Sequence, residues 1–124
     1  LQRFGIDIGI AFQITDDLLD LTGDQQVVGK TTGRDLDMGK LTLPLIRALR
    51  DSNESARQSI TALVRDRCHA QLRDRLCKDG WFDSVEQTVV ERVASARRHL
   101  EDLPDNQATT MLHLLADAIV ARTF

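Results

Sequence analysis

Residues 9–20 read GIAFQITDDLLD, and they lie inside a longer apolar stretch that runs from Gln2 to Thr22. Between residues 4 and 14 the apolar side chains alternate as in a half-buried strand, but others recur three or four residues apart as in a helix. Strands rarely exceed roughly 10 residues, so the length of the stretch favours a helix buried on several sides. Gly5 and Gly9, one helical turn apart, would let a neighbouring helix come close.

An acidic cluster ends this stretch. In a helix, Asp16 and Asp20 lie one turn apart on the same face, Gln13 lies one turn earlier, and Asp17 reaches the same edge. Two ionised carboxylates about 6 Å apart repel by roughly 3 kcal/mol at an effective dielectric near 20, but by less than about 1 kcal/mol in water. The spacing therefore fits either a solvated acidic helix end or a cleft that needs a cation, for which all-oxygen ligands favour Mg²⁺.

The segment after the cluster favours the cation site. Residues 23–40 contain four glycines, and Lys30, Arg34 and Lys40 lie among them. Lysines act as point charges on phosphate groups, and a bound metal neutralises the remaining charge. Carboxylates followed by such a loop therefore predict a diphosphate site, although any single surface lysine can serve solubility alone.

The rest of the chain is predicted to be helical. Thr42 is a candidate N-cap with Pro44 in the first turn of a short helix over 43–50, and residues 54–78 form one helix or two, capped by Ser52 or Asn53 and followed by Gly80. A further helix is predicted to begin at Asp83 and to end before Pro104, and a last helix follows a cap at Asp105 or Asn106. With no strand beyond the ambiguous start, the fold class is all-α.

Composition excludes several function classes. The 124 residues suffice for one domain, and 42% hydrophobic with 28% charged residues is ordinary for a globular protein. A net charge of -3 and a 4% aromatic content argue against nucleic-acid binding. No apolar run predicts a transmembrane segment, and Cys68 and Cys77 are expected to be two reduced thiols of a cytoplasmic protein. Because the chain starts at Leu1 inside a patterned stretch, we expect it to be a fragment.

Residues 9–20 closely resemble the second aspartate-rich motif of the trans-isoprenyl (polyprenyl) diphosphate synthases. The lysine-bearing stretch that follows this motif in the family is matched by Gly29-Lys30, by Gly33-Arg34-Asp35 and by residues 39–44, GKLTLP. The resemblance implies that residues 1–124 are the C-terminal part of a single all-α synthase domain, a helical bundle around a deep cavity, and that the protein is a homodimer.

The resemblance also implies a reaction and a set of roles. An allylic diphosphate, ionised with the help of Mg²⁺, would condense with isopentenyl diphosphate to give a longer trans-polyprenyl diphosphate. No catalytic base stands out, and without the family's first aspartate motif this chain alone is expected to be inactive. The implied site residues are Asp16 as a direct metal ligand, Asp17 and Asp20 in support, Lys30 and Lys40 on the allylic diphosphate, Phe12 and Gln13 near the substrate chains, and Asp35 ordering the loop or the metal-bound waters.

Three alternatives remain open. A terpene cyclase of the same fold usually carries an Asn/Ser/Glu pattern in its second metal motif. A non-catalytic subunit of a heteromeric synthase often loses the aspartates, and all three are present in this sequence. An unrelated helical scaffold requires the acidic cluster to be a coincidence. Arg122 is interpreted as a helix-end charge, with contact to a substrate phosphate as the alternative.

Overall fold

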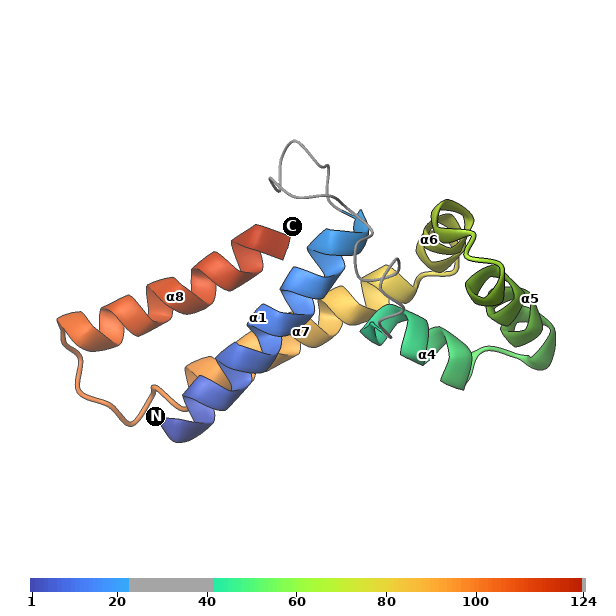
Figure 1. Ribbon diagram of the computed structural model, residues 1–124. Coiled ribbons are helices and arrows are strands. Elements are labelled where there is room, and N and C mark those ends of the chain that lie inside the picture. Colours follow the sequence, from blue (N-terminus) through green and yellow to red (C-terminus); the bar gives the residue numbers. More distant parts are fainter. Residues whose placement is uncertain (23–41, 124) are drawn as a thin grey trace. The chain divides into compact units, whose positions relative to one another are not determined.

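The computed structural model describes residues 1–22 and 42–123, and these residues form six α-helices and no strand (Figure 1). The prediction of an all-α chain is confirmed. None of the helices in the described ranges is long and apolar enough to span a membrane. The helices are α1 (Gln2–Thr22), α4 (Leu43–Asp51), α5 (Glu54–Arg65), α6 (His69–Lys78), α7 (Trp81–Arg98) and α8 (Gln107–Thr123).

The ambiguous first stretch is one continuous helix, α1, so the strand interpretation of its alternating residues is wrong. Phe4, Ile8 and Ala11 are buried on one side, while Ile6 and Phe12 remain exposed. The side chains three or four residues apart, rather than two apart, therefore share the buried face. The close approach expected at Gly5 and Gly9 is not seen in the described residues, because a Cβ at either position would meet no atom within 4 Å.

The chain divides into two compact units, one made of Leu1–Asp16 and Glu86–Phe124 and the other of Asp17–Val85. The core of the first unit is a cluster of apolar side chains from α1, α7, α8 and the residues just after α7. Burial of one such side chain contributes about 1.5–3 kcal/mol. The cluster comprises Phe4, Ile8, Ala11, Val89, Val93, Ala96, Leu100, Ala116 and Ile119.

A buried carboxylate joins α1 to α7 within this unit. Asp7 is only 7% exposed. Its Oδ2 accepts a hydrogen bond of 2.8 Å from Ser95 Oγ and lies 3.3 Å from Nε2 of His99, while Oδ1 accepts one of 3.1 Å from Nη1 of Arg92. Burial raises the pKa of Asp7, but the hydrogen bonds from Ser95 and Arg92 and the charges of Arg92 and His99 outweigh it, so the pKa lies below its usual value.

In the second unit, residues 54–78 were predicted to form either one helix or two. They form two helices, α5 and α6, which contact each other and α4. The break falls at Arg67, whose φ of 55° lies in the left-handed region that a helix does not use. Of the two candidate caps, Asn53 is the one used, because its Oδ1 accepts a 2.8 Å hydrogen bond from the backbone N–H of Ala56.

The remaining helix ends follow the predicted signals closely. Thr42 is the N-cap position of α4 and Pro44 lies in its first turn, although the Thr42 side chain makes no capping hydrogen bond. Gly80 follows α6 with a φ of 84°, which favours glycine, and α7 begins at Trp81, two residues before the predicted start at Asp83. Asn106 caps α8 through a 3.0 Å hydrogen bond from the Thr109 N–H. Both cysteines are free thiols, as expected.

Candidate functional site

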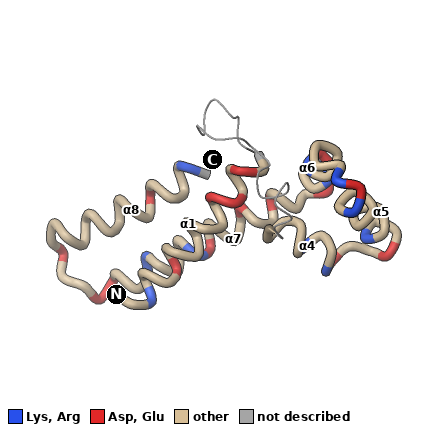
Figure 2. The backbone as a smooth tube through the Cα atoms, in the orientation of Figure 1, with Lys and Arg blue, Asp and Glu red and all other residues tan. Residues whose placement is uncertain are grey.

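The three motif aspartates lie in the last two turns of α1, where Figure 2 marks acidic positions in red. They differ sharply in burial. The Asp16 side chain is 38% exposed and Asp17 is half-buried, whereas Asp20 is only 2% exposed. Asp16 and Asp17 are therefore partly accessible to a ligand in this chain, whereas Asp20 is enclosed.

A positively charged side chain, that of Arg122, lies against Asp16. Nη2 of Arg122, in the last turn of α8, is 3.0 Å from Oδ1 of Asp16, and Figure 2 shows the basic position at that end of α8 in blue. The same guanidinium lies over the ring of Phe12, 5.0 Å from its centroid. Because Phe12 precedes Asp16 by one turn of α1, a single arginine contacts two residues of the motif.

The predicted site residues fall into two groups. Phe12 and Gln13 are exposed on α1, one turn before the aspartates, and Phe12 is 48% exposed. Lys30, Asp35 and Lys40 lie outside the described residues. The structure thus brings Phe12 and Asp16 together through Arg122, and the roles expected for the loop residues stay predictions.

The geometry of the motif limits how it can hold a metal ion. The described ranges contain no group of three or more His, Cys, Asp or Glu side chains that could hold a metal ion by themselves. Magnesium in enzymes is commonly held by one or two carboxylates, several waters and substrate phosphates. Asp16, partly exposed and already in contact with a guanidinium, offers one such carboxylate to a cation. A single accessible carboxylate is compatible with a metal whose other ligands are waters and phosphate oxygens.

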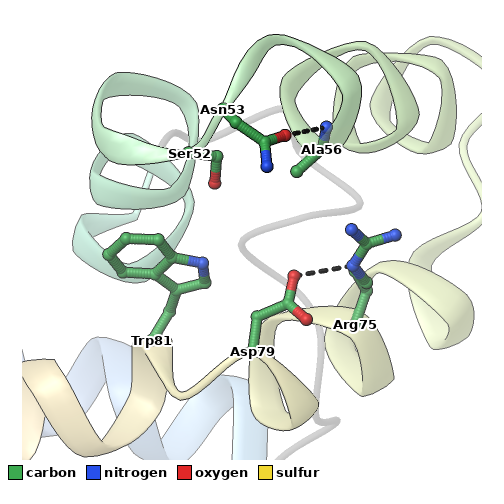
Figure 3. A pocket seen from close by; sticks show the side chains of 6 residues that line it. All are labelled: Ser52, Asn53, Ala56, Arg75, Asp79 and Trp81. Carbon is green, nitrogen blue, oxygen red and sulfur yellow. Dashed lines mark hydrogen bonds and ion pairs between the residues drawn. The ribbon is translucent and has the colours of Figure 1, made fainter.

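One pocket formed by the described residues lies elsewhere in the second unit. It has a volume of about 330 Å³ and is lined by Ser52, Asn53, Ala56, Arg75, Asp79 and Trp81 (Figure 3). Nε of Arg75 donates a 2.6 Å hydrogen bond to Oδ2 of Asp79 across its wall. Among the described residues, none of the predicted site residues (Phe12, Gln13, Asp16, Asp17 and Asp20) lines this pocket.

The contact between Arg122 and the aspartate motif was not predicted from the sequence. The interpretation of Arg122 as a helix-end charge is compatible with its position in the last turn of α8, but the partner is a motif carboxylate 106 residues away. No local spacing rule connects residues so far apart in the sequence. The only signal in the sequence was an arginine at the end of an apolar helix.

Known proteins resemble this chain along almost all of its length. The family model described as polyprenyl synthetase matches residues 1–78. A short chain isoprenyl diphosphate synthase from Methanothermobacter thermautotrophicus is 30% identical over 98% of this chain and 38% of the relative. This chain therefore spans well under half the length of that relative.

Two solved structures share the fold. The geranylgeranyl pyrophosphate synthetase from Pyrococcus horikoshii Ot3 superposes with a TM-score of 0.83 and 31% identity, covering 95% of this chain and 37% of that one. The polyprenyl synthase from Caulobacter crescentus CB15, complexed with calcium and isoprenyl diphosphate, gives a TM-score of 0.83 and 28% identity over 98% of this chain and 38% of that one. Because the family model matches residues 1–78 and the solved structures share the fold, this chain belongs to the polyprenyl synthetase family.

Proposed function

We propose that residues 1–124 are the C-terminal part of a prenyltransferase that condenses an allylic diphosphate with isopentenyl diphosphate to give a longer trans-polyprenyl diphosphate. Family membership and the names of the similar proteins support this reaction. Because the chain spans only 37–38% of the length of these relatives, the activity is proposed for a longer protein that contains it.

The observation that carries the proposal is the continuous helix α1, which sets Asp16 and Asp20 one turn apart and leaves Asp16 partly exposed. Asp16 would bind Mg²⁺ directly, and Asp17 and Asp20 would support it. When bound, Mg²⁺ stabilises the negative charge that builds on the departing diphosphate. The calcium and isoprenyl diphosphate bound to the Caulobacter protein are a divalent cation and a diphosphate of the proposed kinds.

Other residues of the chain have supporting roles in this proposal. Lys30 and Lys40 would hold the allylic diphosphate, because their charges oppose the charge of the leaving group. Phe12, exposed one turn before Asp16, would offer an apolar surface to the substrate chain and keep water from the allylic cation. Gln13 would lie near the same substrate chains, and Asp35 would order the loop or the metal-bound waters. The homodimer and the cytoplasmic location stay predictions.

The test is prenyl transfer by the full-length synthase, measured as isopentenyl diphosphate incorporated into product with and without Mg²⁺. Asp16→Ala is expected to lower turnover by about 10²-fold or more, the scale for loss of one electrostatic stabiliser in a closed site. Helical content should not change, because the Asp16 side chain is partly exposed.

Asp117→Ala is the matched control, since Asp117 pairs with Arg97 on the surface and lies outside the motif. Full activity of Asp16→Ala would refute the metal-binding role proposed for Asp16. Release of a hydrocarbon from the allylic diphosphate alone would favour the cyclase. A full-length protein that forms no product with or without Mg²⁺ would favour the scaffold or the non-catalytic subunit. Turnover by the isolated 124 residues would refute the fragment assignment.

A further inference from the structure

Arg122 carries an interaction that the proposed reaction does not use. It sits in the last turn of α8 and touches two motif residues of α1, Phe12 and Asp16, which belong with α8 to the same compact unit. One contact is the 3.0 Å ion pair with Asp16, and the other is the position of its guanidinium 5.0 Å above the Phe12 ring. Both contacts are made by the same guanidinium, and together they define where its positive charge lies.

The chemistry of the guanidinium explains both contacts. Arginine stays charged at every working pH, donates along its plane to a carboxylate, and stacks its flat face on an aromatic ring. Asp16 therefore faces a permanent positive charge at one of its oxygens. A divalent cation arriving at the same carboxylate is repelled by that charge, and the two cations compete for Asp16.

We propose that Arg122 is a placeholder cation for Asp16: it holds the carboxylate when no metal is bound, and metal binding displaces it. This inference rests on the proposed function, because it assumes that Asp16 is a metal ligand. Displacement frees the last turn of α8 from α1, while the rest of α8 stays anchored through Ala116 and Ile119 in the core and through the ion pair between Asp117 and Arg97.

The size of the effect follows from exposure. Both side chains of the pair are 38% exposed, so the competition is that of a surface ion pair rather than a buried one. Such pairs change an equilibrium by about 1.5- to 5-fold. Removal of the Arg122 charge should therefore tighten divalent metal binding by about that factor, whereas removal of a residue that helped to bind the metal would weaken it.

The experiment uses the full-length synthase and Mn²⁺ alone, with the free ion counted by electron paramagnetic resonance. Arg122→Gln is compared with the wild type, with Arg122→Lys, and with Arg97→Gln as the matched control. Arg97→Gln also breaks an ion pair that holds α8, but that pair joins Arg97 of α7 to Asp117 of α8 and does not involve Asp16. Hydrogen exchange of the last turn of α8 is followed in parallel, with and without Mn²⁺.

The expected result is Mn²⁺ binding about 1.5- to 5-fold tighter in Arg122→Gln, unchanged in Arg97→Gln, and close to wild type in Arg122→Lys. Mn²⁺ should raise exchange in the last turn of α8 of the wild type, and this turn should already exchange faster in Arg122→Gln. In an Asp16→Asn background, Arg122→Gln should change nothing.

Two results would overturn the inference and leave the proposed function standing. The first is equal or weaker Mn²⁺ binding by Arg122→Gln while Asp16→Asn still abolishes binding. The second is an equal gain in Arg97→Gln, which would mean that any loosening of α8 has the same effect. A third result, binding by Asp16→Asn as tight as by the wild type, would refute the proposed metal role itself.

Discussion

Replacement of Asp7 should destabilise the chain far more than replacement of any exposed carboxylate. Asp7 is 7% exposed and receives two hydrogen bonds, from Ser95 and Arg92. A hydrogen bond to a charged group contributes about 1.5–3 kcal/mol, and a broken buried ion pair costs about 3–5 kcal/mol. The Arg92 side chain is 46% exposed, however, so water partly replaces its lost partner. The expected loss for Asp7→Ala is therefore about 2–4 kcal/mol.

The assay is urea unfolding of the chain followed by circular dichroism at 222 nm. A loss of this size lowers the midpoint, and the melting temperature falls by roughly 6–20 °C. Asp117→Ala is the matched control, because it removes an acid that also pairs with an arginine of α7 but is 57% exposed. Its expected loss is less than about 1 kcal/mol. Equal losses in the two variants would refute the assignment of Asp7 as a buried link between α1 and α7.

Three further predictions concern the same chain. The pKa of Asp7 in the folded chain lies below its ordinary value. The stabilisation by the Asp7 carboxylate is therefore complete above the ordinary pKa and is lost as the pH falls through the lower, folded-state pKa. When the unfolding free energy is measured against pH, its fall in acid should be shallower in Asp7→Asn. Gly9→Ala should raise the unfolding free energy by about 0.5–1 kcal/mol in thermal melts, because helical glycine is replaced where a Cβ meets no atom within 4 Å; a loss would show that a neighbour lies there. Asn53→Ala should lower the unfolding free energy by about 1 kcal/mol in urea titrations, since the N-cap of α5 is lost. Asn53→Asp should keep most of that stability, because aspartate also caps helices.

The sequence predicted the features that depend on neighbouring residues. Gly80 marked the end of α6, and Asn53 and Asn106 were among the predicted caps, because capping and left-handed turns are local events. The break near Arg67 was not predictable, since neither glycine nor proline marks it. The two helices on either side of this break contact each other and α4, which the local sequence does not encode.

The contacts of α1 with distant helices could not be predicted from neighbouring residues. No role was predicted for Asp7 from the sequence, and its partners lie 85 and 88 residues away on α7. Arg122 and Asp16 are 106 residues apart. No spacing rule links such positions, whereas the DDxxD pattern of residues 16–20 could be recognised as a candidate site because all its groups lie within two turns.

The most direct measurement is a crystal structure of the full-length protein with Mg²⁺ and an allylic diphosphate analogue that cannot ionise. We predict an Mg²⁺ ion about 2.1 Å from a carboxylate oxygen of Asp16, with diphosphate oxygens completing its shell. An ordered diphosphate whose metal ions contact neither Asp16 nor its two neighbouring aspartates, with Asp16 facing bulk water, would contradict the assignment.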